Sequence, residues 1–302
     1  MKVLITGGAG FIGSHVVEEC IAHNYEVVVI DNLSTGKREN ISSISKIYTM
    51  EINDDCLKDV FEVEKPDYVI HLAAQASVMK SIEDPISDGL TNIIGTLRLL
   101  ECARIYGVKK FVMASSAAVY GNPDTLPVDE KSPLNPLSFY SLSKWSSERY
   151  AQLYESLYGL SSCILRFSNV YGPRQNPLGE AGVVSIFINQ LLNCEKMVIY
   201  GGQQTRDFVY VKDVAKACRT AIESSKSGIF NISSNSETTI DELFSMTSLL
   251  SGITSKPQKY PMRIGEIEKS ILGNDKASKE LSWLASHSLQ EGLKETITTF
   301  QQ

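Results

Sequence analysis

KVLITGGAGFIG, residues 2–13, is the stretch that decides the fold. Lys2–Thr6 is a short apolar run that ends in glycines, a pattern typical of a buried parallel strand. Gly7, Gly10 and Gly13 permit a tight turn, close approach of a pyrophosphate to the backbone, and close packing of helix on strand. We therefore expect a dinucleotide site at the amino end of the following helix, where unpaired N–H groups and the helix dipole favour anions.

Asp31 closes a second apolar run, Glu26–Ile30. An acid at the end of this second strand can accept hydrogen bonds from the adenosine ribose, and its charge repels a 2′-phosphate. The pattern therefore predicts NAD rather than NADP, although Lys37 and Arg38 could soften that repulsion. The alternative is that Asp31 only caps a turn or a helix.

Strand-like and helix-like segments alternate through the first half of the chain. Further strands are expected at Tyr68–Leu72, Lys110–Ala114 and Ser162–Phe167, and helices at roughly Ile12–His23, Asn92–Tyr106 and Tyr140–Tyr158. Such alternation predicts an α/β fold with a doubly wound parallel sheet of the Rossmann type, covered by helices on both faces.

The alternation loosens after about Ser168, where turn-rich stretches appear. We expect residues 1–167 to form an NAD-binding Rossmann domain and residues 168–302 to form mainly a smaller C-terminal substrate-binding region. The strand-into-helix pattern of Phe208–Ala217 and the short strand Gly228–Ile232 predict that the chain returns to the sheet near residues 208–233.

The composition excludes several classes of protein. The formal net charge of -6 over 302 residues argues against a nucleic-acid surface. No apolar stretch approaches the roughly 20 residues of a membrane helix, and the N-terminus leads directly into a strand, which leaves no room for a signal peptide. The six cysteines form no close pair, so we expect reduced, buried thiols, no metal site and a cytoplasmic enzyme.

Tyr140 and Lys144 lie four residues apart on an expected helix, so their side chains can meet on one face. A phenol with its ordinary pKa of about 10 is a poor base at neutral pH, but a nearby ammonium and a nicotinamide ring would favour the phenolate. Ser115 and Ser116 follow the strand Lys110–Ala114 at the edge where such sheets bind ligands, and a hydroxyl there could relay a proton. The alternatives are a core tyrosine beside a surface lysine, and serines that only cap a turn.

With these features, the chain resembles the extended short-chain dehydrogenases/reductases of the NAD-dependent epimerase/dehydratase family, and within them the UDP-galactose 4-epimerase group. The matching stretches run nearly from end to end: TGGAGFIGSH (6–15), DNLSTGKREN (31–40), HLAA (71–74), NIIGT (92–96), SSAAVYG (115–121), YSLSK (140–144), RFSNVYGPRQ (166–175) and TRDFVYVKD (205–213).

The resemblance implies a reaction and a set of site residues. Tyr140 would be the base, Lys144 its partner, and Ser116 the hydroxyl beside the reacting sugar oxygen. The enzyme would be a UDP-hexose 4-epimerase that interconverts UDP-glucose and UDP-galactose through a 4-keto intermediate with tightly bound NAD. The implied cofactor positions are Gly7, Gly10, Phe11, Ile12, Gly13, Asp31, Asn32, Ser34, Gly36, Glu51, Ile52, Leu72, Ala73, Ala74, Asn92, Tyr140 and Lys144. The implied substrate positions are Ser116, Asn169, Val183, Tyr200, Arg206, Arg263 and Ser270.

Departures from the family pattern narrow the reaction. Ala117 and Ala118 stand where the family's sugar dehydratases place an Asp-Glu pair and its decarboxylases usually keep a Glu. Alanine cannot transfer a proton, so dehydration and decarboxylation are disfavoured. Ser270 matches a position where a bulky tyrosine restricts the pocket, so serine suggests tolerance of the N-acetylated UDP-hexoses; the alternative is an incidental loop residue. Glu51 stands where an Asp near the adenine is usual.

Three other functions remain open at this point. The first is an NAD-dependent oxidoreductase that releases its product oxidised or reduced. The second is a non-catalytic dinucleotide-binding module, which would have no use for Ser116, Tyr140 and Lys144 together. The third is a UDP-glucuronate 4-epimerase, which would want an additional cation near carbon 6 of the sugar. The resemblance also implies a homodimer, in which the helices near Asn92–Tyr106 and Tyr140–Tyr158 form a four-helix interface.

Overall fold

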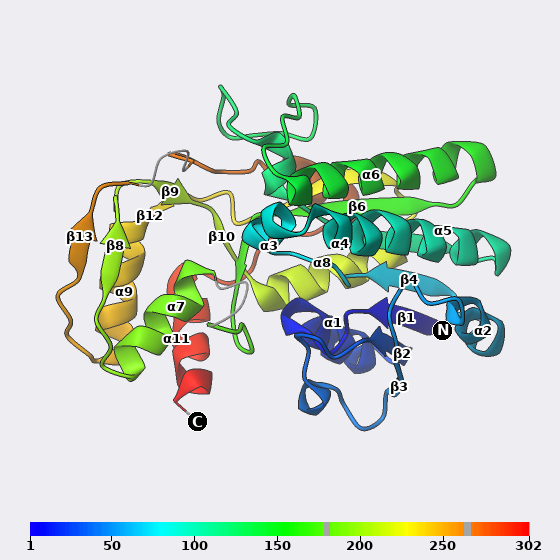
Figure 1. The fold of residues 1–302 in the computed structure, drawn as a ribbon, viewed down its shortest axis with the longest axis horizontal. Coiled ribbons are helices and arrows are strands. Elements are labelled where there is room, and N and C mark those ends of the chain that lie inside the picture. Colours follow the sequence, from blue (N-terminus) through cyan, green and yellow to red (C-terminus); the bar gives the residue numbers. More distant parts are fainter. Residues whose placement is uncertain (178–181, 263–266, 302) are drawn as a thin grey trace.

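The computed structural model describes residues 1–177, 182–262 and 267–301. Within these residues, a seven-stranded parallel sheet has the order β11-β6-β5-β4-β1-β2-β3 (Figure 1). Its strands are β1 (Lys2–Thr6), β2 (Glu26–Asp31), β3 (Lys46–Thr49), β4 (Tyr68–His71), β5 (Lys110–Ser116), β6 (Ser162–Phe167) and β11 (Gly228–Ile232). The order reverses between β1 and β4, and at such a reversal the loops diverge and leave a crevice for ligands. The predicted doubly wound α/β sheet is confirmed.

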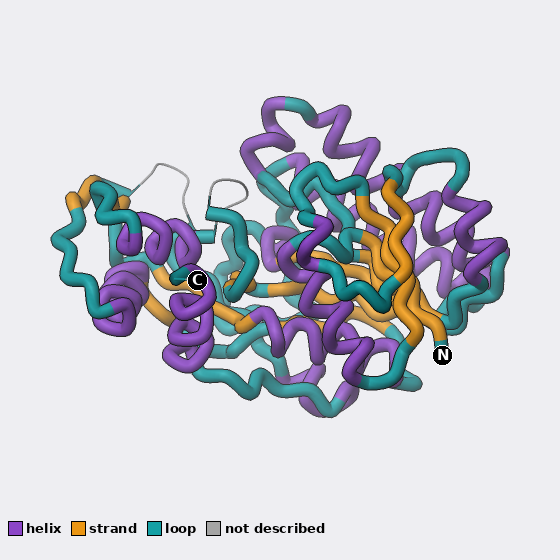
Figure 2. Tube along the Cα trace, turned by 90° about the horizontal axis from the view of Figure 1, so that it is seen from below, coloured by secondary structure: helices purple, strands orange, loops and turns teal. Residues whose placement is uncertain are grey.

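Helices cover both faces of the sheet because its central strands are apolar on both sides. Val3 and Ile5 of β1 lie in the core on one face, and Leu4 lies in a second core on the other. Figure 2 shows the strands between these helices. The first face carries α1 (Phe11–Ala22), α8 (Val211–Glu223) and α10 (Asp275–Leu281); the second carries α2 (Leu57–Glu64), α5 (Thr96–Ile105) and α6 (Phe139–Tyr158).

A smaller, mainly helical part of the C-terminal half lies beside the sheet, at the left of Figure 1. Its core includes Phe187, Phe244 and Leu293. Its elements are α7 (Val183–Leu192), α9 (Ile240–Ser251) and α11 (Leu289–Phe300), with the strand pairs β7 (Asn169–Tyr171) and β10 (Phe208–Tyr210), β8 (Val198–Tyr200) and β13 (Gln258–Tyr260), and β9 (Thr205–Arg206) and β12 (Thr238–Thr239). Two other elements of the C-terminal half lie with the sheet instead: α8 packs on α1, and β11 pairs with β6. The division at residue 167 remains a prediction.

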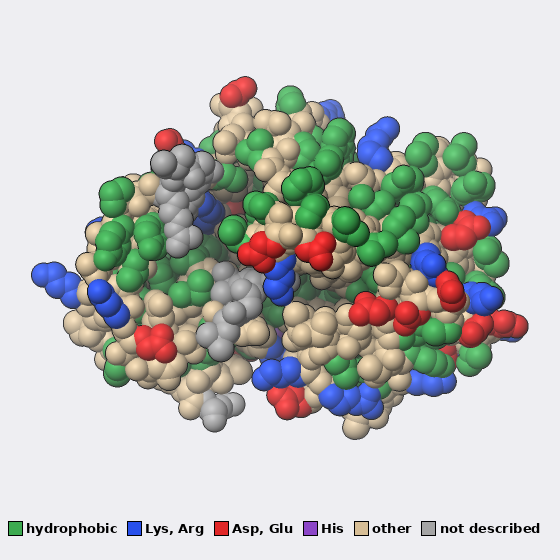
Figure 3. Space-filling model, in the orientation of Figure 1, with side chains coloured by type: hydrophobic (Ala, Val, Ile, Leu, Met, Phe, Trp, Pro, Cys, Tyr) green, Lys and Arg blue, Asp and Glu red, His purple; other side chains and the backbone are tan. Residues whose placement is uncertain are grey.

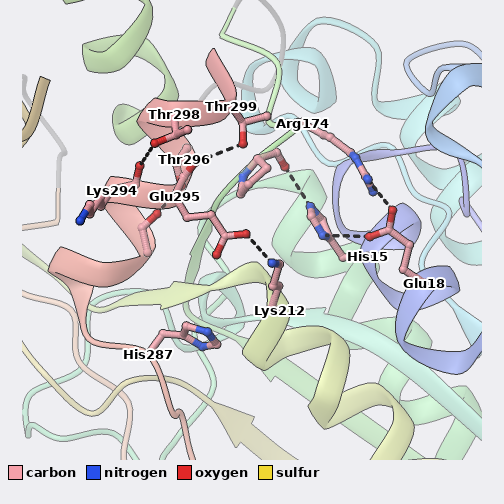
Figure 4. A network of polar contacts seen from close by, with 12 residues as sticks. His15, Glu18, Arg174, Lys212, His287, Lys294, Glu295, Thr296, Thr298 and Thr299 are labelled. Atoms are coloured by element: carbon pink, nitrogen blue, oxygen red, sulfur yellow. Dashed lines mark hydrogen bonds and ion pairs between the residues drawn. The ribbon is translucent and has the colours of Figure 1, made fainter. Parts of the chain in front are cut away.

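Polar contacts join this smaller part to α1 and α8, two of the helices that cover the sheet (Figure 4). Burial lowers the pKa of His15, so the neutral ring of this α1 residue donates from Nε2 to the carbonyl oxygen of Pro173, at 3.0 Å. Lys212 of α8 pairs with Glu295 of α11. The helix that follows the glycine-rich turn, α1, therefore contacts the segment that leads into the smaller part.

Several details differ from the sequence expectations. β5 extends through Ser115 and Ser116, which are therefore strand residues rather than the start of a loop. The helix expected to begin near Asn92 begins earlier, at Pro85, and passes through a π-helical turn at Leu90–Gly95 before it continues to Ile105. Cys56 and Cys194 are exposed, whereas the other four thiols are buried as expected. The remaining short helices are η1 (Arg38–Asn40), α3 (Val78–Glu83), α4 (Pro85–Gly89), η2 (Leu90–Gly95) and η3 (Ala117–Tyr120).

Among the helices of the described residues, none combines the length and the apolar character that crossing a bilayer requires.

Candidate active site

The turn after β1 brings backbone against backbone. Gly7 has φ +71°, and a Cβ added to it would lie 2.7 Å from the amide nitrogen of Ala73. A Cβ on Gly13 would lie 2.0 Å from the carbonyl oxygen of Gly7. Gly10 is the N-cap residue of α1, and it has no side chain that could bond the first N–H groups of the helix. These contacts form a cradle that only glycines allow, with the amino end of α1 available for a pyrophosphate.

Asp31 is buried at the end of β2 and holds the loops on both sides of the cradle. Its Oδ2 accepts from Ala9 N at 2.8 Å, and its Oδ1 accepts from Leu33 N at 2.8 Å. A Cβ on Gly36 would lie 3.0 Å from Oδ1, so the glycine lets this loop approach the carboxylate. The carboxylate thus organises two turns, and it stands at the position expected for a ribose contact.

Asn32, Ser34 and Glu51 form a connected rim beyond Asp31. Ser34 donates to Asn32 Oδ1 from both its N–H and its hydroxyl, at 3.0 and 2.8 Å. Asn32 Nδ2 donates to Glu51 Oε1 at 2.9 Å. The side chain of the neighbouring Ile52 lies in the core instead.

A directional chain of hydrogen bonds holds the end of β4. The Thr96 hydroxyl donates to Asn92 O at 2.6 Å, so its oxygen accepts from His71 Nε2 at 2.9 Å. Burial lowers the pKa of His71 to about 3, so the ring is neutral and its Nδ1 accepts from the Thr6 hydroxyl at 2.7 Å. Ala73 N in turn donates to Thr6 Oγ1 at 3.2 Å. Leu72, Ala73 and Ala74, all half-buried, are thereby held beside the glycine cradle.

Asn92 clamps the segment that follows. It accepts from Gln75 N at 2.9 Å and donates to Gln75 O at 2.9 Å. Its Nδ2 also lies 3.1 Å from Ser143 Oγ on α6. Its supporting position is therefore between the β4 loop and the helix that carries the expected catalytic pair.

Tyr140 and Lys144 lie on the first turns of α6, and a capping box between Ser138 and Ser141 fixes where this helix begins. Lys144 is buried, and its Nζ donates to Ala114 O of β5 at 3.2 Å. The structure therefore places the expected catalytic lysine against the strand that ends at Ser116.

A cavity of about 150 Å³ opens at the carboxyl end of β5. It brings together four of the residues expected at the substrate: Ser116, Asn169, Arg206 and Ser270. The Ser116 hydroxyl oxygen also accepts from Ala118 N at 3.2 Å, so this serine caps η3 as well. Ala117 and Ala118 line the same cavity.

The other expected substrate residues lie elsewhere or outside the described residues. Val183 begins α7, and the Tyr200 ring stacks on Tyr260 with centroids 5.6 Å apart. Neither is among the residues that line the cavity. Arg263 lies outside the described residues. The two arginines expected to converge on a diphosphate are therefore represented by Arg206 alone.

Residues 3–233 match the NAD dependent epimerase/dehydratase family. The chain belongs to this family. The structure is similar to the UDP-glucose 4-epimerase of Thermotoga maritima with UDP-glucose, at 44% identity and a TM-score of 0.97, covering 100% of this chain and 99% of that one. It is similar to the UDP-glucose 4-epimerase of Thermus thermophilus in complex with NAD, at 41% identity and a TM-score of 0.94, with the same coverage. It is also similar to the UDP-N-acetylglucosamine 4-epimerase of Methanobrevibacter ruminantium, at 36% identity and a TM-score of 0.95, covering 99% and 98%.

Membership of this epimerase/dehydratase family confirms the recognition made from the sequence and supports NAD as cofactor. The residues present fit that cofactor, because the glycine cradle admits backbone but no side chain, and the Asp31 carboxylate lies at the end of β2. The roles of the individual site residues remain predictions.

Sequence reasoning missed the residues that hold this family's site together. One group of hydrogen bonds links β1, β4 and the η2–α5 helix, and its members are Thr6, His71, Gln75 and Thr96. A second group joins loops through the carboxylate of Asp207. In the His71–Ala74 motif, the sequence pattern points to Leu72, Ala73 and Ala74 and gives His71 no role. A buried polar residue within an apolar strand was the signal that could have identified His71, since such a residue needs partners.

Proposed function

We propose that the protein is an NAD-dependent UDP-hexose 4-epimerase that interconverts UDP-glucose and UDP-galactose. One observation carries the proposal: one helical turn from Tyr140, the buried Lys144 bonds the strand whose last residue, Ser116, lines a cavity with Asn169 and Arg206. The UDP-glucose 4-epimerases of similar structure support the choice of substrate.

Tyr140 acts as the base in this proposal. Its phenolate takes the proton of the sugar's 4-hydroxyl, and the Lys144 ammonium favours the phenolate by its positive charge. The Ser116 hydroxyl hydrogen-bonds the reacting oxygen. NAD, when bound, supplies a hydride acceptor that then serves as the hydride donor.

The rest of the cavity separates anchoring from reaction. Arg206 and Asn169 hold the diphosphate, and the guanidinium is itself oriented, since its Nη1 donates to Thr205 O and Ile267 O at 2.8 Å each. The sugar carries no charge and is held more loosely, so the 4-keto form can turn over while the nucleotide stays in place. Binding energy at the nucleotide thus keeps the substrate in the site while the sugar turns and presents first one face and then the other to the same reacting groups.

Ala117 and Ala118 favour epimerisation over the other reactions considered. Both line the cavity beside Ser116, where an acidic side chain would have reached the sugar. Neither methyl group can donate or accept a proton, so the elimination of water has no acid–base pair at this position.

Ser270 extends the proposal to the N-acetylated pair, UDP-N-acetylglucosamine and UDP-N-acetylgalactosamine. It lines the same cavity as Ser116 although it is far away in the sequence. A small side chain there leaves volume that a tyrosine would fill. The similar structure of a UDP-N-acetylglucosamine 4-epimerase supports this extension.

A homodimer is also proposed, through η2, α5 and α6, which are the helices expected near Asn92–Tyr106 and Tyr140–Tyr158, together with the adjoining α3 and α4. Figure 3 shows hydrophobic side chains gathered on this face. The exposed ones on these helices are Val78, Met79, Ile82, Ile86, Leu90, Ile94, Ile105, Phe139, Leu142, Tyr150, Leu153, Leu157 and Tyr158. An apolar patch of this extent is typical of a protein interface. We further infer a cytoplasmic protein, because all six cysteines are free thiols.

Turnover without added cofactor tests the function. Purified protein is incubated separately with UDP-glucose and with UDP-galactose, and the sugars are resolved by proton NMR while absorbance at the NADH band is followed. An epimerase brings both samples to the same mixture without accumulating NADH. NADH formed in proportion to product would favour an oxidoreductase, and binding of UDP-sugar without interconversion would favour a non-catalytic module.

A further inference from the structure

A buried ion pair lies directly behind the candidate active site. Arg166 of β6 and Glu148 of α6 are each 1% exposed. Arg166 Nε donates to Glu148 Oε1 at 2.9 Å, and Nη2 donates to Oε2 at 2.6 Å, so the pair is bidentate. Such geometry fixes both the distance and the orientation of the two elements that carry it.

The pair also contacts the strand that carries the active-site serine. The Ser115 hydroxyl donates to Glu148 Oε1 at 2.5 Å. Successive residues of a strand point to opposite sides, so Ser115 faces α6 while Ser116 lines the cavity. The carboxylate therefore holds the end of β5 from behind.

The third arm of the guanidinium reaches the cavity wall. Arg166 Nη1 donates to the Tyr120 hydroxyl at 2.9 Å. Burial raises the pKa of Tyr120 to about 12, so its proton stays on and is donated to Asn231 Oδ1 at 2.7 Å. Asn231 Nδ2 in turn donates to the carbonyl oxygens of Val128 and Gly273, at 3.0 and 3.2 Å. Val128 and Leu272, the residue before Gly273, both line the cavity.

The position of Glu148 along α6 gives this network its consequence. Tyr140, Lys144 and Glu148 follow one another at intervals of four, so they form one stripe along the helix face that meets β5. Lys144 bonds Ala114 O and Glu148 bonds Ser115, so two successive members of the stripe are attached to successive strand residues. A shift of the helix at Glu148 is transmitted to Tyr140, about 12 Å away along a rigid helix.

We propose that Glu148 and Arg166 are positioning residues that set the register of α6 against β5 and thereby place Tyr140 opposite Ser116. This inference rests on the proposed epimerase function. A buried ion pair is seldom needed for stability, because apolar residues of similar volume often replace it without loss. The bidentate bonds from Arg166 to Glu148 on α6, together with the single bond from Ser115 at the end of β5, provide what an apolar pair does not, namely a defined axial register.

The experiment separates register from stability. Glu148→Gln removes the charge and keeps the shape, but it leaves Arg166 without a counter-ion. The double variant Glu148→Leu/Arg166→Met removes both charges and keeps an apolar, filled site. Glu64→Gln is the matched control: Glu64 is also buried and holds lysines, but it bonds Lys2 at the first residue of β1, at the amino-terminal end of the strands and away from the cavity at the carboxyl end of β5.

The readouts are kcat and KM for UDP-glucose, together with the midpoint of thermal unfolding. We expect kcat to fall by about 10- to 100-fold in Glu148→Gln and in the double variant, as a displacement near 1 Å produces, with KM changed less than about threefold. Glu64→Gln should lower the unfolding midpoint and keep kcat.

Wild-type kcat in the folded double variant would overturn the inference and leave the proposed function intact. So would a loss of kcat in Glu64→Gln equal to that in Glu148→Gln, because it would trace the effect to stability. If the wild-type protein fails to interconvert the two UDP-sugars, the proposed function is wrong and the inference falls with it.

Discussion

Lys144 Nζ on α6 donates a hydrogen bond to the backbone carbonyl oxygen of Ala114 on β5, at 3.2 Å. The bond attaches the helix of Tyr140 to the strand that ends at Ser116. Lys144 is buried, so its ammonium is held by the surrounding protein and does not extend into solvent. The positive charge is thus held within the site, one helical turn from the phenol whose ionised form it would favour.

Tyr140→Phe should abolish most turnover and leave binding nearly unchanged. The variant removes only the hydroxyl that would take the proton, and a positioned base contributes about 10²- to 10⁴-fold. The measurements are kcat by NMR and UDP affinity by calorimetry. Turnover like that of the wild type would remove Tyr140 from the mechanism.

Ser270→Tyr should make the enzyme selective for the smaller sugars. The ring would fill cavity volume next to Ser116, so kcat/KM for UDP-N-acetylglucosamine should fall at least about tenfold relative to that for UDP-glucose. Ser270→Ala, which stays small, is the control and should accept both. Undiminished N-acetylhexosamine activity in the tyrosine variant would refute the gate.

Asp207→Ala should weaken substrate binding. This buried carboxylate accepts from Ser234 N at 2.9 Å, Ser168 Oγ at 3.2 Å and Leu272 N at 3.3 Å, and the last two residues line the cavity. Losing it leaves several buried donors unsatisfied, at about 1–3 kcal/mol each. We expect KM for UDP-glucose to rise more than kcat falls; an unchanged KM would contradict this.

Acid should destabilise the protein through Glu64. Burial opposes its ionisation, but hydrogen bonds from Lys2, Lys46 and Tyr48 hold its pKa at about 2, below the ordinary 4.5. Because the folded-state pKa is the lower one, the stabilisation is fully present above about pH 4.5 and is lost as the pH falls toward 2.

Glu64→Gln should remove this pH dependence. After allowance for solvent screening we expect a loss of about 1–2 kcal/mol at pH 7, and a smaller difference from the wild type at pH 3. Urea unfolding at the two pH values measures both. A constant difference between variant and wild type would exclude Glu64 as the titrating group.

Leu153→Glu/Leu157→Glu should convert the proposed dimer into a monomer. These α6 side chains are 48% and 68% exposed, and charges there cannot be buried against a second copy. Leu249→Glu, on α9 and 79% exposed, lies outside this surface and should keep the dimer. Light scattering on a sizing column gives the mass; a monomeric wild type would dismiss the interface.

Local patterns predicted most of the sheet and the placement of Tyr140 and Lys144 on one helix. β1, β2 and β6 were expected at or within one residue of their observed bounds, because apolar runs closed by turn residues are a local signal. Short strands such as β9 and β12, of two residues each, are too brief for any periodicity. They form because distant segments pair.

By itself, the sequence determined what depends on neighbours along the chain: the strand–glycine-turn–helix unit, the acid that closes β2, and the spacing of Tyr140 and Lys144. Only the tertiary structure decided which distant groups meet, as Ser270 does with Ser116 in one cavity and Arg166 does with Glu148 in one buried pair. The physical reason is that backbone geometry sets the spacing within one element, whereas contacts between elements depend on how the whole core packs.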